Sequence, residues 1–255
     1  MFTYKNVMWV DTETTSVDYN EAEILQVAVG AFNAQNSSVI TVQDWFYDVD
    51  GEISPMCSSI NNIVKSMVVG KPRFKDSNDL NNFIRNNDIR YAVAHNAKFD
   101  AAVLKHNGLD VNLRWICTLR MAKKLFHDNS TFENFQLNYL RYRLGVQVEN
   151  SSLHEAKFDV LLCSKIFDCL AEICIELGLV SNGDDLMEEI YEWAKQPIIY
   201  TTMPIGKHKG IPMMDVPMDY WSWALDNMDL LDSTSEKYDY DFAESVAYCF
   251  EQKGF

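Results

Sequence analysis

Three predicted strands follow one another at the start of the chain, with only short polar links between them. Apolar and β-branched residues fill ranges 7–10, 24–32 and 39–47, and the links at 16–20 and 33–38 have the length of hairpin connections. Such short links favour antiparallel pairing, because a parallel crossover needs a dozen or more residues. This predicted meander limits the chain to folds whose sheet begins with antiparallel neighbours.

Helical and strand patterns alternate after the meander. Short strands are predicted over 91–94 and 115–118, and helices over 58–69, 78–84, 99–106, 132–144 and 155–177. A meander followed by alternating helices and strands is the plan of a mixed sheet covered by helices. We therefore predict an α/β fold of the ribonuclease H-like kind, in which parallel strands extend the antiparallel meander and helices flank the sheet.

The length of the chain limits the number of domains. Its 255 residues are enough for one sizeable core and a small appendage. We predict a main domain over 1–180, an acidic linker or surface helix over 181–198, and a small C-terminal segment over 199–255. This last segment combines a Gly-Lys turn with an acidic tail.

Acidic residues outnumber basic ones, with 37 Asp and Glu against 22 Lys and Arg, and the formal net charge is −15. This balance argues against a protein that binds nucleic acid through its overall charge. The charge is unevenly distributed, because range 114–143 has six basic and two acidic residues whereas range 215–244 has nine acidic residues and one lysine. A basic face on the main domain therefore stays compatible with the sequence.

No stretch of the sequence predicts membrane insertion or export. The longest apolar range, 160–180, is interrupted by four charged residues, and the first ten residues lack an apolar signal core. The six cysteines show no metal-type or disulfide-type spacing, so we interpret them as reduced thiols. These features predict a cytoplasmic protein that is neither membrane-bound nor secreted.

Carboxylates and one histidine stand where predicted strands end and helices begin. Asp11 and Glu13 end the first strand, and the two-residue period of a strand puts both on one face. Asp100 follows strand 91–94, and His154 and Asp159 stand at the start of the long helix. Each also has an ordinary interpretation, such as a polar strand end, an acid in the first turn of a helix, or a capped helix start.

The four carboxylates together predict a metal site. Clustered carboxylates repel one another and raise one another's pKa values unless cations neutralise them. Their oxygens suit hard cations such as Mg²⁺ or Mn²⁺, and two such ions about 4 Å apart can stabilise the attacking and leaving oxygens of a phosphodiester cleavage. We therefore predict two divalent cations, Mg²⁺ or Mn²⁺, held by Asp11, Glu13, Asp100 and Asp159.

Three short motifs resemble those of a known family. Asp11-Thr12-Glu13, then His95-Asn96-Ala97-Lys98-Phe99-Asp100, then His154 with Asp159 five residues later are similar in order and spacing to the motifs of the DEDDh (DnaQ-like) 3′→5′ exonucleases. The resemblance implies that Asp11, Glu13 and Asp159 hold the nucleophile-side metal, and that Asp11 and Asp100 hold the leaving-group metal. It also implies that His154 is the general base, a role that a neutral imidazole can fill near pH 7.

Five residues are predicted to contact the substrate. Thr14 directly follows the acidic pair and is predicted to touch the terminal sugar, and Asn96 and Phe99 belong to the second motif. Lys207 and Lys209 form a basic turn suited to a phosphate backbone. Thr14 can equally be an ordinary loop residue, and the lysine turn can be an exposed solubilising loop.

These residues together predict a 3′→5′ exodeoxyribonuclease that hydrolyses terminal phosphodiesters and releases 5′-mononucleotides. Its predicted partner is the 3′ end of DNA, single-stranded or frayed, and the resemblance implies a place in DNA repair. RNA stays open as a substrate, because the same site serves either sugar. A non-catalytic nucleic-acid-binding module on the same fold is the alternative from another class, and the sequence leaves open a homo-oligomer.

Overall fold

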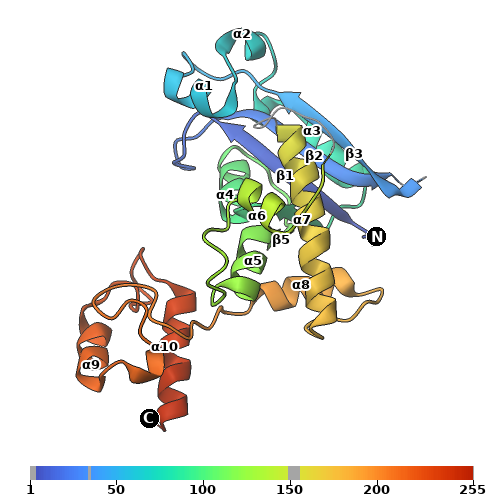
Figure 1. Ribbon diagram of the computed structural model, residues 1–255. Helices are drawn as coiled ribbons and strands as arrows, with labels where there is room; N and C mark the ends of the chain where they lie inside the picture. Colours follow the sequence, from blue (N-terminus) through green and yellow to red (C-terminus); the bar gives the residue numbers. More distant parts are fainter. Residues whose placement is uncertain (1–3, 34–35, 149–155, 255) are drawn as a thin grey trace. The chain divides into compact units, whose positions relative to one another are not determined.

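The computed structural model describes residues 4–33, 36–148 and 156–254 (Figure 1). Its elements divide into two compact units. The first consists of Met1–Met121 and Asn134–Trp193, and the second of Ala122–Glu133 and Ala194–Phe255. Our division of the chain into a main domain, an acidic linker and a C-terminal segment stays a prediction about domains, and each compact unit is described below by itself.

The first unit contains a five-stranded mixed sheet. Its strands are β1 (Val7–Thr14), β2 (Ile24–Asn33), β3 (Asn36–Phe46), β4 (Tyr91–Ala94) and β5 (Arg114–Cys117). The strand order is β3-β2-β1-β4-β5, with antiparallel pairing within the meander β1–β3 and parallel pairing between β1 and β4 and between β4 and β5. This arrangement confirms the predicted ribonuclease H-like mixed sheet.

Helices cover both faces of this sheet, and alternate residues of β1 contact different helices. Helix α7 (Ala156–Glu176) crosses β1, β2 and β3 on one face, where Phe167 meets Trp9 edge-on (Figure 1). On the other face, Met8 and Val10 belong to a core that includes residues of α3 (Asp79–Asn86) and α4 (Ala97–His106). Burial of apolar side chains on both faces explains why the first four residues of β1 are all buried.

The remaining elements of the first unit show where the helix predictions were wrong. These elements are α1 (Pro55–Asn61), α2 (Lys65–Val68), the 3₁₀ turn η1 (Phe74–Asp76), α6 (Leu137–Arg143) and α8 (Leu186–Lys195), whose last residues enter the second unit. The helix predicted over 58–69 is two helices, because Asn62 adopts a left-handed conformation with φ 58°. The helix predicted over 132–144 is confined to α6, and α5 (Thr118–Phe126) was not predicted at all.

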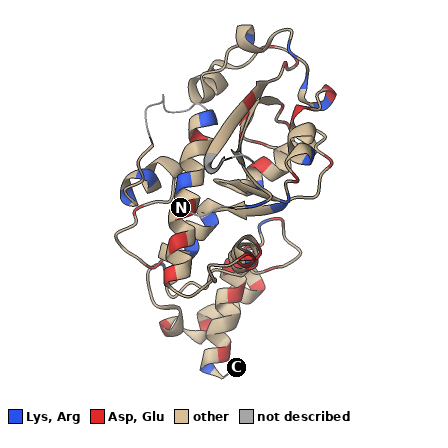
Figure 2. Cartoon of the chain, turned by 90° about the vertical axis from the view of Figure 1, so that its right-hand side faces the viewer, with Lys and Arg blue, Asp and Glu red and all other residues tan. Residues whose placement is uncertain are grey.

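The second unit is a small helical cluster. Its core combines Met213 of the 3₁₀ turn η2 (Met213–Asp215), Trp221 of α9 (Met218–Asn227) and Phe242 of α10 (Tyr240–Lys253). Helix α10 also buries Val246 and Cys249, so the acidic tail supplies part of this core rather than a loose extension. Figure 2 shows several acidic bands along the helix that ends at the C-terminal mark, which is α10.

The lengths and compositions of the described helices bear on membrane insertion. A membrane-spanning helix needs about 20 predominantly apolar residues. Within the described ranges, no helix is both long enough and apolar enough to cross a membrane.

Candidate active site

The alternation of side chains along β1 separates two sets of polar groups. Asp11 and Glu13 lie on the same face as Trp9, which is the face covered by α7, whereas Thr12 lies on the opposite face, towards α4. Asp159 stands in the first turn of α7. The period-two prediction for Asp11 and Glu13 therefore agrees with the geometry, and α7 adds a third carboxylate to them.

Three carboxylates form a cluster that could hold a metal ion. One carboxylate oxygen from each of Asp11, Glu13 and Asp159 lies within 4.8 Å of the other two, and all three residues are partly buried. Oxygens at this separation are close enough to share one hard cation. The cluster thus brings together residues that are about 150 positions apart in the sequence.

Asp100 belongs to the α4 side of the same region. It lies in the first turn of α4 and is only 4% exposed, and its Oδ1 accepts a hydrogen bond of 2.8 Å from the Thr12 hydroxyl. Its charge nevertheless raises the pKa values of Asp11 and Glu13. The fourth predicted ligand is therefore electrostatically part of the site, although a different helix supplies it.

The pKa values of these carboxyl groups are raised chiefly by burial. For Asp11 the pKa is raised well above its usual value by burial and then by the charges of Asp100, Glu13 and Asp159. The pKa of Glu13 rises to about 8 through burial and the neighbouring charges of Asp159 and Asp100. The pKa of Asp100 rises to about 7 through burial, against which the Thr12 hydrogen bond acts. Carboxyl groups arranged in this way either keep protons or bind a cation, so the donor set fits a divalent metal.

Contacts with the sheet hold the first turn of α7. Lys157 forms an ion pair of 2.7 Å with Asp44 of β3, and Gln26 of β2 donates a hydrogen bond of 2.8 Å to the same carboxylate. Gly30 of β2 lies so close to α7 that a Cβ atom there would come within 2.9 Å of the Val160 side chain. These contacts set the position of Asp159, which lies between Lys157 and Val160 in the sequence.

A groove of about 300 Å³ runs beside Glu13. Thr14 and Phe99, two of the predicted substrate contacts, line it together with the exposed apolar side chains of Met56 and Ile60 on α1. The Thr14 hydroxyl donates to the Ser16 carbonyl oxygen at 2.7 Å. The groove therefore places a partly apolar surface directly next to the carboxylates.

Asn96 and His154 are the other two predicted residues of this region. Asn96 is exposed and precedes α4 in a left-handed conformation with φ 71°, which an asparagine tolerates better than most residues. His154, the predicted general base, lies outside the described residues. Its predicted role stays a prediction.

Comparison with known proteins places this geometry in a family. A family model described as an exonuclease matches residues 8–167, which is more than half of the chain and includes all of the predicted motif residues. The chain belongs to the DnaQ-like 3′→5′ exonuclease family. It is accordingly a nuclease and a hydrolase, and this membership favours the predicted enzyme over a binding module without turnover.

Individual relatives of this exonuclease agree with the family assignment. Exodeoxyribonuclease 10 of Escherichia coli (strain K12) is 25% identical over 223 residues, which are 86% of this chain and 90% of the relative. The DNA polymerase III subunit epsilon of Treponema pallidum (strain Nichols) is 29% identical over 163 residues, which are 62% of this chain and 72% of that protein. A solved structure, Exonuclease X in complex with 5′ overhanging duplex DNA, shares the fold with a TM-score of 0.53 at 21% identity, over 74% of this chain and 99% of that one.

Three residues that form hydrogen bonds within the candidate site were not predicted from the sequence. Thr12 stands between two acids in the first motif, and the strand period could have placed it on the opposite face of the strand. Cys57 and Asn61 of α1 both donate to the Thr14 carbonyl oxygen, from Sγ at 3.0 Å and from Nδ2 at 3.3 Å. Side-chain bonds to a distant backbone carbonyl leave no local pattern in the sequence, so nothing there could have indicated these two contacts.

Lys207 and Lys209 belong to the second unit. They are exposed in a turn between Gly206 and Gly210, both of which have positive φ values of 74° and 84°. The amide of Lys209 donates to the Gly206 carbonyl oxygen at 3.2 Å, which closes the turn. The compact basic turn predicted from the sequence is therefore present, and its contact with substrate stays a prediction.

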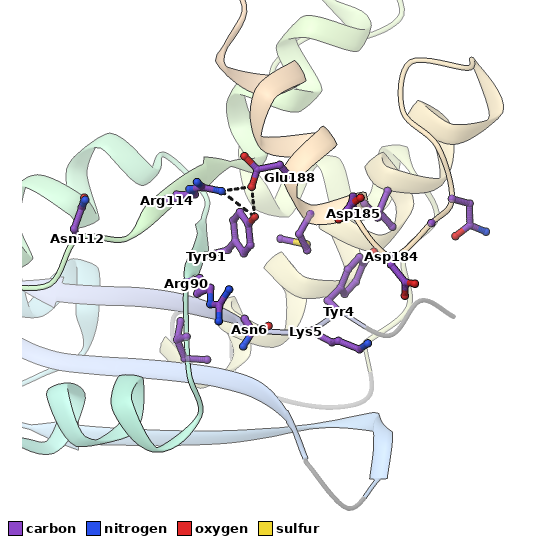
Figure 3. A pocket seen from close by; sticks show the side chains of 15 residues that line it. Tyr4, Lys5, Asn6, Arg90, Tyr91, Asn112, Arg114, Asp184, Asp185 and Glu188 are labelled. Carbon is purple, nitrogen blue, oxygen red and sulfur yellow. Dashed lines mark hydrogen bonds and ion pairs between the residues drawn. The ribbon is translucent and has the colours of Figure 1, made fainter.

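A larger cavity, of about 600 Å³, lies at the opposite ends of the parallel strands. Tyr91 and Arg114, the first residues of β4 and β5, both contact Glu188 of α8 at its edge (Figure 3). The Arg114 guanidinium also lies over the rings of Tyr91 and Tyr191. The Glu188 carboxylate accepts hydrogen bonds from both Tyr91 and Arg114. We therefore interpret this cluster as the contact that fixes α8 to the sheet edge rather than as a second active site.

Proposed function

We propose that this exonuclease removes nucleotides from the 3′ ends of single-stranded or frayed DNA and releases 5′-mononucleotides. The observation that carries the proposal is the cluster of Asp11, Glu13 and Asp159 beside a groove of about 300 Å³. Its DNA preference is supported by relatives, because one is named an exodeoxyribonuclease and another was solved in complex with duplex DNA.

Divalent cations, Mg²⁺ or Mn²⁺, would be held by the buried carboxylates. In the proposal, Asp11, Glu13 and Asp159 hold one cation and Asp11 and Asp100 hold the other. Two such cations stabilise the attacking and leaving oxygens of a phosphodiester when bound. Without cations, burial and mutual repulsion disfavour the ionised form of these carboxyl groups. Bound cations would remove this penalty, which supports this ligand set.

The remaining residues orient the substrate and accept a proton. His154 takes the proton of the attacking water, and a neutral imidazole is suited to this near pH 7. Thr14 and Phe99 contact the terminal nucleotide along the groove, and Asn96 contacts the strand at the start of α4. Lys207 and Lys209 offer positive charge to the phosphate backbone.

A time course on 5′-labelled single-stranded DNA and RNA of identical sequence tests the proposal. We expect a ladder that shortens from the 3′ end of the DNA with Mg²⁺ or Mn²⁺, and no reaction with EDTA. Asp11→Asn and Asp159→Asn should abolish the ladder, because each removes a cluster carboxylate. Asp110→Asn, an exposed aspartate outside the site, is the matched control and should retain activity.

Each other outcome contradicts a stated part of the proposal. Faster degradation of RNA than of DNA would change the substrate class, because two strands without thymine or uracil differ only in the 2′-OH. Wild-type activity in Asp11→Asn or Asp159→Asn would show that these carboxylates do not carry the reaction. Activity in EDTA would contradict the need for cations.

A further inference from the structure

Tyr142 is an exposed aromatic residue on α6. It is 71% exposed, the largest exposed fraction of any aromatic side chain in the described residues. A single exposed aromatic side chain needs no explanation by itself. Its contacts and the charge around it decide whether it has a function.

Two ring contacts connect Tyr142 with the aspartate-bearing turn of α7. The guanidinium of Arg141 lies over the Tyr142 ring, 5.5 Å from its centre, and over the Phe158 ring, 5.2 Å from its centre. Phe158 is buried and directly precedes Asp159. Arg141 also donates a hydrogen bond of 3.3 Å to the Val148 carbonyl oxygen, which helps to fix its position. Arg141 thus connects Tyr142 with Phe158, the residue that directly precedes Asp159.

The charge around Tyr142 favours a polyanion. Range 134–148 contains two arginines, Arg141 and Arg143, and no acidic residue, in a chain whose net charge is −15. The other exposed aromatic residues of the described part all have an acidic residue within four positions on both sides: Tyr19, Trp223, Tyr240 and Tyr248. Tyr142 therefore differs from them in having no acidic residue within four positions, and acidic residues repel phosphate.

We infer that Tyr142 is a base-stacking subsite for the substrate strand, an inference that rests on the proposed exonuclease function. A nucleobase stacks on the exposed surface of the Tyr142 ring, and the arginines on either side of it supply positive charge for the neighbouring phosphates. The subsite takes an unpaired nucleotide other than the one released, because the groove beside Glu13 receives the terminal one. Stacking on a ring is tolerant of sequence, so the subsite favours single strands without selecting a base.

Steady-state kinetics of the full-length chain test this subsite. The substrates are a 5′-labelled single-stranded oligonucleotide and an oligonucleotide of equal length whose internal nucleotides are abasic. We expect Tyr142→Ala to raise KM on the normal strand about fivefold or more while kcat stays within about twofold. Tyr142→Phe, which keeps the ring, should behave like wild type. Tyr248→Ala, an exposed tyrosine with acidic neighbours on α10, is the matched control and should also behave like wild type.

The abasic strand separates stacking from a structural effect. If Tyr142 stacks on a base, wild type and Tyr142→Ala have the same KM on the abasic strand. Equal KM values on the normal strand, or an equal rise on both strands, would overturn the subsite and leave the exonuclease function intact. If the wild type released no nucleotide, the proposed function would fail, and fluorescence anisotropy with the same strands would then decide the subsite: weaker binding by Tyr142→Ala only on the normal strand supports it, and equal binding overturns it.

Discussion

Thr12 stands between two acids of the cluster, Asp11 and Glu13, yet its side chain contacts Asp100 on the other face of β1. Its hydroxyl donates to Asp100 Oδ1 at 2.8 Å, and both residues are buried. Burial raises the pKa of Asp100, and the hydrogen bond opposes that rise because it stabilises the ionised carboxylate. One neutral side chain therefore helps to keep a predicted metal ligand charged.

The Thr12→Val substitution keeps the side-chain shape and removes the hydroxyl. We expect the pKa of Asp100 to rise further, so the acid side of the activity–pH profile should move to higher pH and activity at pH 7 should fall about tenfold. The measurement is kcat/KM against pH at a subsaturating Mg²⁺ concentration, because saturating Mg²⁺ would itself displace the proton from a ligand carboxylate. Thr12→Ser retains a hydroxyl and should keep the wild-type profile, and an unshifted profile for Thr12→Val would contradict the role of this hydrogen bond.

The raised pKa values also make the stability of the metal-free chain depend on pH. Glu13 and Asp100 have folded-state pKa values of about 8 and about 7, above those of the unfolded chain, so the folded chain binds more protons between about pH 4 and pH 8. Their contribution to stability is therefore fully present below the unfolded pKa values and is lost as the pH rises through 7 and 8.

Calorimetry in EDTA tests this pH dependence. We expect Glu13→Gln to have a higher Tm than wild type at pH 8.5, where the wild type must ionise a buried group, and no such advantage at pH 5. Added Mg²⁺ should raise the Tm of wild type more at pH 8.5 than at pH 5, because ligand carboxylates must be deprotonated. A Tm difference between Glu13→Gln and wild type that did not change with pH would contradict the raised pKa of Glu13.

At the scale of elements, the close approach of α7 to β2 fixes where Asp159 can lie. Gly30 permits this approach, because a Cβ atom there would come within 2.9 Å of both Val160 on α7 and Ile40 on β3. Val160 is fully buried in an interior packed at high density, so its branched side chain has little room to move away. A helix that carries a predicted metal ligand is thus positioned by the absence of one methyl group.

Gly30→Ala should push α7 away from the sheet. We expect a loss of about 1–3 kcal/mol in the free energy of unfolding from overpacking, together with weaker Mg²⁺ binding as Asp159 moves away from Asp11 and Glu13. Denaturant titration and Mg²⁺ calorimetry would measure the two effects. Gly183→Ala is the matched control, since a Cβ atom there meets nothing within 4 Å. If Gly30→Ala lost stability but bound Mg²⁺ with wild-type affinity, the predicted effect of Gly30 on the position of Asp159 would be wrong.

Sequence patterns predicted the sheet better than the helices. The strand ranges agree with β1 to β5 because period-two alternation and short links are local properties. The single helix predicted over 58–69 is broken because polar side chains compete with helical hydrogen bonds there: Asn61 Oδ1 accepts from the Ile63 amide, and the Ser58 hydroxyl donates to the Ile63 carbonyl oxygen. Both bonds span five residues or fewer, but the spacing of apolar residues, on which the helix prediction rests, does not report them.

The candidate site shows a similar difference between residues that local patterns identify and contacts that join distant parts of the sequence. Asp11 and Glu13 could be paired from the strand period, and Asp159 could be added from the family resemblance. The two contacts from α1 to the Thr14 carbonyl oxygen span 43 and 47 residues and follow no periodicity. The pairing of Ala122–Glu133 with Ala194–Phe255 in one unit was likewise beyond prediction, because it joins segments separated by the long helix α7.

At the scale of the whole molecule, a net charge of −15 opposes a polyanionic substrate. Neutralising exposed acids of the second unit with Asp226→Asn, Glu236→Gln and Glu251→Gln should therefore lower KM for an oligonucleotide at low ionic strength. The effect should vanish near 1 M salt, where charges are screened within about 3 Å. KM measured against salt concentration checks this, and identical curves for wild type and the triple variant would show that these charges do not reach the substrate.

The second unit is assembled from two segments of the chain, Ala122–Glu133 and Ala194–Phe255. Between them in the sequence lies a segment of the first unit that contains α6, α7 and most of α8. During synthesis, Ala122–Glu133 leaves the ribosome before its partner segment Ala194–Phe255 exists. At about 5–20 residues per second, translation of the intervening segment takes on the order of 3–12 s. The five-stranded sheet can form during this time, whereas the second unit can form only after Ala194–Phe255 has been synthesised. A nascent chain that stalls before Ala194 would therefore carry the carboxylates of the first unit together with Ala122–Glu133, a segment whose partner in the second unit is missing.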